Sequence, residues 1–137
     1  MFHCEKLDAW RRSIEPADLV HRVTRSFPDN ERFGLTNRLR RAAASISSNL
    51  AEGCLRSSKV DFARVVELAM GSAFEAASPS VIAQRQGCLT IAEFASIQNS
   101  TLEITRMLRG LRRPLLRQTN GPRRAAKLPS TFNLQLL

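Results

Sequence analysis

The segment LTNRLRRAAASISSNLAEG, residues Leu35–Gly53, decides the predicted fold. Its apolar residues recur every three or four positions, which places them on one stripe of an α-helix. The stripe consists of Leu35, Leu39, Ala42 or Ala43, Ile46 and Leu50. Such a stripe must be buried against other helices, and the small residues beside it, from Ala42 to Ser48, permit a close approach. We therefore expect this helix to lie inside a tight bundle.

The ends of this helix carry recognisable signals. Thr36 or Asn37 is suited to cap its first turn, and Gly53 to end it in a left-handed backbone conformation. Positive charge gathers near its start, on Arg38, Arg40 and Arg41. The segment is thus predicted to be a basic helix that stops at Gly53.

Three further amphipathic segments surround it. They are predicted to be helical over about residues 5–26, 58–86 and 90–115. Ser58 with Asp61, and Thr90 with Glu93, have the spacing of capping boxes at the start of the last two. Gly87 is the predicted stop between them.

Three prolines fall inside the predicted helices. Pro16 predicts a kink or short break in the first helix, because proline removes one backbone donor. Pro79 predicts that the third helix bends or splits near Ala76 to Ser78, and Pro114 marks the predicted decay of the fourth. The helices are therefore not expected to be straight rods throughout.

Four amphipathic segments joined by short connections predict an all-α fold, an antiparallel up-down-up-down four-helix bundle. We assign residues 1–116 to this bundle. Residues 117–137 contain four basic residues, no acidic ones and several helix breakers. They are predicted to form a flexible, disordered basic tail.

The charge balance is the clearest functional signal in the composition. The chain has 137 residues and a formal charge of +9, with 21 Lys and Arg against 12 Asp and Glu. Only Lys6, Lys59 and Lys127 are lysines. Arginine offers a planar fork that matches phosphate and carboxylate groups, although genomic codon bias produces the same excess. The partners that this charge indicates are RNA or DNA, or an acidic protein.

Cysteine usage and hydropathy bear on the compartment. Cys4, Cys54 and Cys88 are far apart and form no CxxC motif, which argues against a zinc site and against a disulfide framework. No apolar run approaches a membrane span, and no signal peptide is recognisable. We therefore expect reduced thiols, no membrane partner and a cytoplasmic location.

No catalytic constellation can be assembled from the sequence. His3 and His21 have no motif partners, and HExxH, GxSxG, P-loop and GxGxxG patterns are missing. Glu52, Glu67 and Glu75 are placed to hold a metal across a bundle, but the ExxH motif of di-iron bundles does not accompany them. We predict no catalytic residue, no metal and no cofactor.

The predicted nucleic-acid-binding residues form two groups of cations on the central hairpin and the last helix. They are Arg38, Arg40, Arg41, Arg56, Lys59, Arg64, Arg106, Arg109, Arg112 and Arg113. In the predicted topology Arg56, Lys59 and the arginines of the last helix share one end of the bundle, where we expect them to contact phosphates. Because the chain has no Tyr, such binding is expected to follow backbone and shape rather than base identity.

Other polar residues have simpler structural interpretations. In an antiparallel hairpin Arg38 or Arg41 comes level with Glu75, so an ion pair is expected there. Ser45 and Asn49 lie one turn apart and are expected to form a hydrogen-bonded contact across the bundle. Trp10, the single tryptophan, is expected to anchor the core.

Several stretches together resemble a known family. They are FPDNERFGLTNRLRRAAASISSNLAEG (residues 27–53), LDAW (7–10), the AxGSxxE pattern (69–75) and EITRMLRGL (103–111). This combination resembles the bacterial four-helix-bundle proteins encoded by intervening sequences in 23S rRNA genes. The resemblance covers about residues 2–116 and leaves out the tail.

The resemblance implies a left-handed antiparallel bundle that assembles as a homopentamer. It also implies kinship with the accessory protein of diversity-generating retroelements, which binds nucleic acid and a reverse transcriptase. The residues at the family's motif positions are Arg40, Arg41, Ser45, Asn49, Glu52, Gly53, Gly71, Ser72 and Glu75. The chain departs from the family pattern at Pro16, Asn37 and Pro79.

The sequence therefore predicts a non-catalytic, oligomeric accessory protein that binds nucleic acid, with RNA as the expected partner, through an arginine-rich surface. Two alternatives stay open. One is a scaffold that binds an acidic protein, such as a reverse transcriptase. The other is a functionally idle relative.

Overall fold

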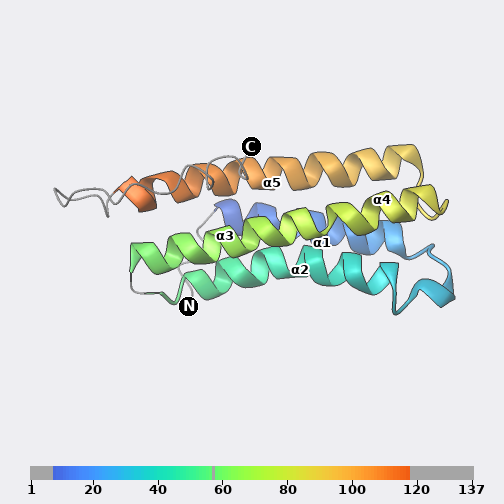
Figure 1. Ribbon diagram of the computed structural model, residues 1–137, viewed down its shortest axis with the longest axis horizontal. Helices are drawn as coiled ribbons and strands as arrows, with labels where there is room; N and C mark the ends of the chain where they lie inside the picture. Colours follow the sequence, from blue (N-terminus) through green and yellow to red (C-terminus); the bar gives the residue numbers. More distant parts are fainter. Residues whose placement is uncertain (1–7, 57, 118–137) are drawn as a thin grey trace, which may run out of the picture.

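The computed structural model describes residues 8–56 and 58–117, and every regular element in that part of the chain is helical. The elements are α1 (Asp8–Thr24), the 3-10 helix η2 (Asp29–Glu31), α2 (Leu35–Gly53), α3 (Lys59–Glu75), α4 (Ala77–Arg85) and α5 (Ile91–Arg117). Figure 1 shows that α4 continues the direction of α3, so these two helices form one interrupted rod. The predicted all-α class is confirmed.

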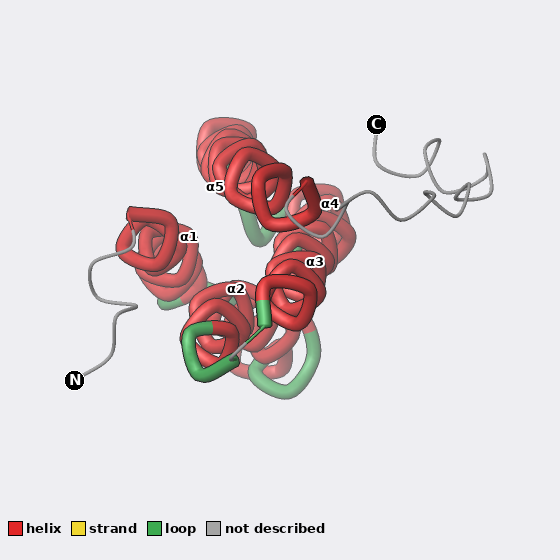
Figure 2. The backbone as a smooth tube through the Cα atoms, turned by 90° about the vertical axis from the view of Figure 1, so that its left-hand side faces the viewer, coloured by secondary structure: helices red, strands yellow, loops and turns green. Residues whose placement is uncertain are grey.

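The four rods alternate in direction along the chain (Figure 1). The end-on view in Figure 2 places α1, α2, α3 and α5 around a common interior. α1 packs against α2 and α5, and α3 packs against the same two helices. Because neighbours in sequence are neighbours in space, the bundle has the antiparallel up-down-up-down arrangement that the short connections predicted.

The core is formed by the predicted stripe of α2. Leu39, Ile46 and Leu50 are completely buried, and Ala43 and Leu35 are nearly so. Burying one such leucine or isoleucine side chain stabilises a fold by about 1.5–3 kcal/mol. Two clusters of buried residues result, one around Ile46 and Leu50 and one around Leu35 and Leu39, and Trp10 packs against the first as expected.

The start of α2 differs from the prediction. The helix begins after Gly34, and neither Thr36 nor Asn37 caps it. Instead the Leu35 N–H donates to Glu31 Oε2 at 3.4 Å, and Glu31 is the last residue of η2. The side chain that caps α2 therefore lies in the preceding turn and not in the first turn of the helix.

Both predicted capping residues cap their helices, and one of the two pairs forms the complete capping box. The Asp61 N–H donates to Ser58 Oγ at 3.1 Å. At α5 the pair is reciprocal, since the Glu93 N–H donates to Thr90 Oγ1 at 3.1 Å and the Thr90 N–H donates to Glu93 Oε1 at 2.9 Å. These bonds satisfy backbone donors that a helix start leaves open.

The glycines at the helix ends have two different roles. Gly87 has the only positive φ among the described residues, 78°, and ends the α4 rod as predicted. Gly53 is the last residue of α2, as predicted, but it does not adopt the left-handed conformation that was expected there. A Cβ at Gly53 would lie 2.7 Å from Phe62 Cδ2, so a larger residue there would force the side chains of α3 to shift.

The prolines interrupt fewer helices than predicted. α3 ends at Glu75 and α4 begins at Ala77, so the expected split before Pro79 is confirmed. No break occurs at Pro16, which lies inside a continuous α1 and is fully buried. α5 likewise continues past Pro114 to Arg117. That proline lies in the last turn, where it removes a single hydrogen bond.

The structure corrects two further expectations, one about the cysteines and one about the start of the tail. Cys54 is disulfide-bonded and Cys88 is a free thiol, so the expectation of reduced thiols is wrong at Cys54. Arg117, the first residue of the predicted tail, belongs to α5. The remaining tail, residues 118–137, lies outside the part of the chain that the structure describes.

None of the described helices combines the length and the apolar character that crossing a membrane would require.

Candidate nucleic-acid interface

The predicted cations lie at opposite ends of the bundle. The connection between α2 and α3 lies at the end where α5 finishes, and the first turns of α2 lie at the other end (Figure 1). We call the first group the α5-end cluster; it consists of Arg56, Lys59, Arg64, Arg106, Arg109, Arg112 and Arg113. We call the second the α2-start cluster; it consists of Arg38, Arg40 and Arg41.

Two members of the α5-end cluster are held by carboxylates. Arg112 Nη2 lies 2.9 Å from Glu67 Oε1 and joins α5 to α3, and its side chain is only 15% exposed. Arg56 Nη2 lies 2.6 Å from Glu52 Oε1, one turn away at the end of α2. These two arginines have structural partners already, so their charge is partly neutralised.

Four other members of that cluster face solvent. Lys59, Arg64, Arg106 and Arg113 are exposed and form no ion pair within residues 8–56 and 58–117. Arg106 and Arg113 are two helical turns apart on the same face of α5, a separation of about 10 Å along the axis. These four residues are the ones that can offer charge to a ligand.

The α2-start cluster also divides into structural and solvent-facing members. Arg40 is half-buried, and its Nε donates to Thr24 Oγ1 at 2.9 Å, which ties α2 to the end of α1. Arg38 and Arg41 are exposed and line a groove of about 540 Å³ between α2 and the junction of α3 and α4. The groove is lined by Asn37, Arg38, Arg41, Ala42, Ser45, Glu75, Ser78 and Pro79.

The predicted meeting of Arg38 or Arg41 with Glu75 is confirmed as a placement but not as an ion pair. All three line the same groove. Among the described residues, however, no ion pair joins Glu75 to either arginine. The antiparallel register thus brings opposite charges to one groove and leaves them apart.

The motif residues between α2 and α3 hold the two helices together. Asn49 Nδ2 donates to Ser72 Oγ at 3.3 Å, and Ser72 Oγ donates to the Leu68 carbonyl at 3.1 Å. The predicted polar contact across the bundle is therefore confirmed for Asn49. It is wrong for Ser45, whose Oγ donates to the Ala42 carbonyl of its own helix at 3.1 Å.

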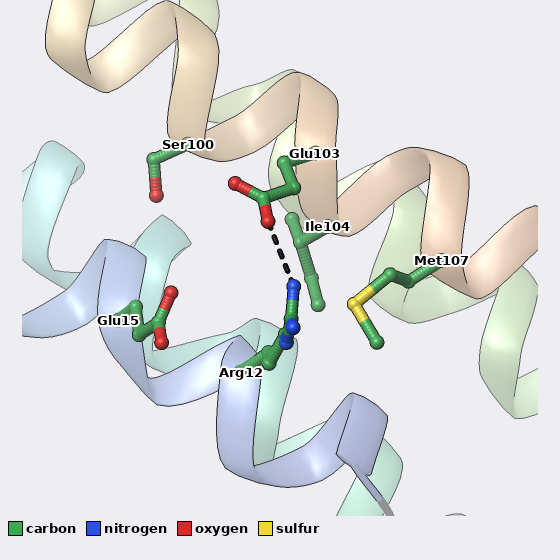
Figure 3. Close-up of a pocket in the computed structure, with 6 residues that line it drawn as sticks. All are labelled: Arg12, Glu15, Ser100, Glu103, Ile104 and Met107. Carbon is green, nitrogen blue, oxygen red and sulfur yellow. Dashed lines mark hydrogen bonds and ion pairs between the residues drawn. The ribbon is translucent and has the colours of Figure 1, made fainter.

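The seam between α1 and α5 carries an ion pair that sequence reasoning missed. Figure 3 shows Arg12 of α1 reaching Glu103 of α5, with an Nη1–Oε1 distance of 2.9 Å and both side chains more than half exposed. Glu15, Ser100 and Met107 line the same hollow, which has no room for a bound molecule. The two residues are 91 positions apart in the sequence, so only the register of their helices could have identified this pair.

The three glutamates considered as metal ligands are not gathered at one site in the described chain. Within residues 8–56 and 58–117, no group of three or more His, Cys, Asp or Glu side chains could hold a metal ion. Glu52 and Glu67 each pair with an arginine, and Glu75 lies in the groove.

Comparison with known proteins places this bundle in a family. A crystal structure of a protein with unknown function from the S23 ribosomal protein family of Bacteroides thetaiotaomicron VPI-5482 has the same fold, with a TM-score of 0.68 and 23% sequence identity over 76% of this chain and 97% of that chain. No curated protein matches the sequence. The 23S rRNA-intervening sequence protein family matches residues 5–110. With that match over most of its length, the chain belongs to the family of 23S rRNA-intervening sequence proteins.

Proposed function

We propose that this protein is a non-catalytic accessory protein that binds nucleic acid, with RNA as the main partner, through the phosphate backbone. The observation that carries the proposal is the exposed set of Lys59, Arg64, Arg106 and Arg113 at one end of the bundle, without ion-pair partners in the described chain. Guanidinium groups bind phosphates in a bidentate manner. A net charge of +9 adds long-range attraction for a polyanion.

The binding mode follows from where the charge lies. The four cations stand on convex helical surfaces, which can contact phosphates but cannot enclose a base. Neutralising about four phosphates gives a slope of log K against log salt of roughly −3 for single strands. Affinity at this surface is therefore expected to fall steeply with salt and to vary little with sequence.

The test compares two variants of equal charge. In one, Lys59, Arg64, Arg106 and Arg113 are all replaced by Gln. In the control, Arg22, Arg25, Arg32 and Arg85, which are exposed at the opposite end of the bundle, are replaced by Gln. Fluorescence anisotropy with a structured RNA at several salt concentrations measures the slope. We expect the first variant to lose most of the slope and the control to keep it; equal loss in both would refute the surface.

A second candidate function, assembly with other protein chains, is favoured by one exposed face. Leu68 and Phe74 on α3 are 53% and 55% exposed, and Gly71 lies between them. A Cβ at Gly71 would meet nothing within 4 Å. Glycine at such a position costs about 1 kcal/mol of helix stability relative to alanine, and the single chain gains no packing in return.

Such a face suits close contact with another helix. The contact would join copies of this chain, as in the homopentamer that the family resemblance implies, or dock an accessory partner such as a reverse transcriptase. Light scattering on the native protein decides whether copies associate, and Phe74→Asp should reduce the mass of the particle to that of one chain. If the protein is a monomer and does not bind RNA, the remaining alternative is a functionally idle relative.

A further inference from the structure

The groove between α2 and the α3–α4 junction contains polar side chains with no internal partners. Asn37, Arg38, Arg41, Glu75 and Ser78 form no side-chain hydrogen bond or ion pair with the described residues. Two guanidinium groups and one carboxylate thus face a shared space without pairing. An arrangement of this kind suits a ligand that carries an acidic group and hydrogen-bond donors.

The shape of the groove depends on Pro79. Proline has no backbone N–H, so it cannot donate to the Glu75 carbonyl, and the rod is interrupted between α3 and α4. Pro79 and Ala42 are buried and form an apolar floor beneath the polar rim. The volume of about 540 Å³ lies within the range of small-molecule sites. That volume is large enough for one nucleotide.

The charges select the kind of nucleotide. An ionised carboxylate only accepts hydrogen bonds, so Glu75 is satisfied by a ligand that brings hydrogen-bond donors as well as the anionic group that the arginines bind. Guanine is the base whose Watson–Crick edge presents two adjacent donors, N1–H and N2–H, which match the two carboxylate oxygens. Adenine and cytosine place a ring acceptor beside their amino group, which would face one of those oxygens. Uracil has one N–H between two carbonyl groups.

We propose that this groove binds one unpaired guanine nucleotide, with Glu75 accepting from N1–H and N2–H of the base while Arg38 and Arg41 bind the phosphate. The nucleotide comes either from a free guanine nucleotide pool or from an RNA loop or bulge, where the Watson–Crick edge is open. The RNA source rests on the proposed function above. The site adds base recognition to a protein whose other cations contact only the backbone.

Free nucleotides provide the first test. Equilibrium dialysis of the full chain with guanosine, adenosine, cytidine and uridine 5′-monophosphates should show at least about a tenfold preference for guanine, the discrimination of one good bidentate contact. Glu75→Gln should abolish that preference and leave the other three nucleotides unchanged. The double variant Arg38→Gln with Arg41→Gln should weaken the binding of all four nucleotides. It should not weaken the binding of guanosine, which lacks the phosphate.

The control variant is Glu15→Gln, which removes one exposed carboxylate from α1, outside the groove. All substituted residues are exposed, so circular dichroism should show unchanged helix content in each variant. Equal binding of the four nucleotides, or a guanine preference that survives Glu75→Gln, overturns the proposal.

An RNA arm distinguishes the two sources. Two hairpins that differ only in one loop base, guanine or adenine, are compared in the native protein and in Glu75→Gln. If the free nucleotides show a guanine preference and the hairpins do not bind, the groove is a site for free nucleotides. That result would contradict the proposed nucleic-acid function. Hairpin binding without base preference, together with unselective mononucleotides, defeats this site and leaves the backbone function standing.

Discussion

α5 meets its two neighbours through ion pairs of equal length and unequal surroundings. On one side Arg112 lies 2.9 Å from Glu67 of α3, with side chains 15% and 44% exposed. On the other, Arg12 of α1 lies 2.9 Å from Glu103, with side chains 53% and 59% exposed. Water and salt screen the second pair much more than the first. Distance alone therefore does not rank these contacts, and burial does.

The largest loss of stability is expected in the core that lies between both seams. Leu108 of α5 is completely buried in a cluster that includes residues of α1, α2 and α3. Leu108→Ala should lower the free energy of unfolding by about 2–5 kcal/mol, because the lost contacts leave a cavity. Urea denaturation followed by circular dichroism measures the loss. Leu102→Ala, on the exposed side of the same helix, should change it by about 0.5 kcal/mol or less. Similar losses in the two variants would contradict the assigned core.

The seam between α3 and α5 should show the next largest effect. Glu67→Gln leaves Arg112 mostly buried without its carboxylate, so we expect a loss of about 1–2 kcal/mol, below the cost of breaking a fully buried pair because Glu67 is partly exposed. A double-mutant cycle with Arg112→Gln isolates the interaction energy. A coupling indistinguishable from zero would show that burial of this pair has no energetic consequence.

The seam between α1 and α5 should show the smallest effect. Glu103→Gln should cost less than about 0.5 kcal/mol at low salt, because both side chains of the pair are largely exposed. Repeating the denaturation near 1 M salt should remove most of even this difference, since the Debye length there is about 3 Å. A loss as large as that of Glu67→Gln would reverse the ranking of the two seams.

Much of the fold could be predicted because its signals are local. The burial of Leu39, Ile46 and Leu50 follows from their spacing, and the capping at Ser58 and Thr90 follows from residues three positions away. Each of these signals operates within one or two helical turns. Errors arose where a distant element intervened, as at Gly53, whose role depends on Phe62 of the next helix.

The candidate sites could be predicted only in part. The antiparallel arrangement predicted that Arg38 and Arg41 lie level with Glu75. It did not predict the groove that these residues line. The bond from Arg40 to Thr24 and the ion pair of Arg112 with Glu67 depend on helix rotation and register, which the charges themselves do not encode. Sequence therefore identifies which arginines exist, and packing decides which of them are available.

The interruption before Pro79 has a consequence for how the bundle opens. α4 spans nine residues between that interruption and the Gly87 turn, a length at which an isolated helix is only marginally stable in water. Its order depends on three anchoring residues that are buried, Pro79, Ser80 and Ala83. Amide protons of α4 should therefore exchange with deuterium sooner than those of α3, through a local opening that leaves the rest of the bundle folded. Since α4 contributes one wall of the groove, any occupant would slow that exchange.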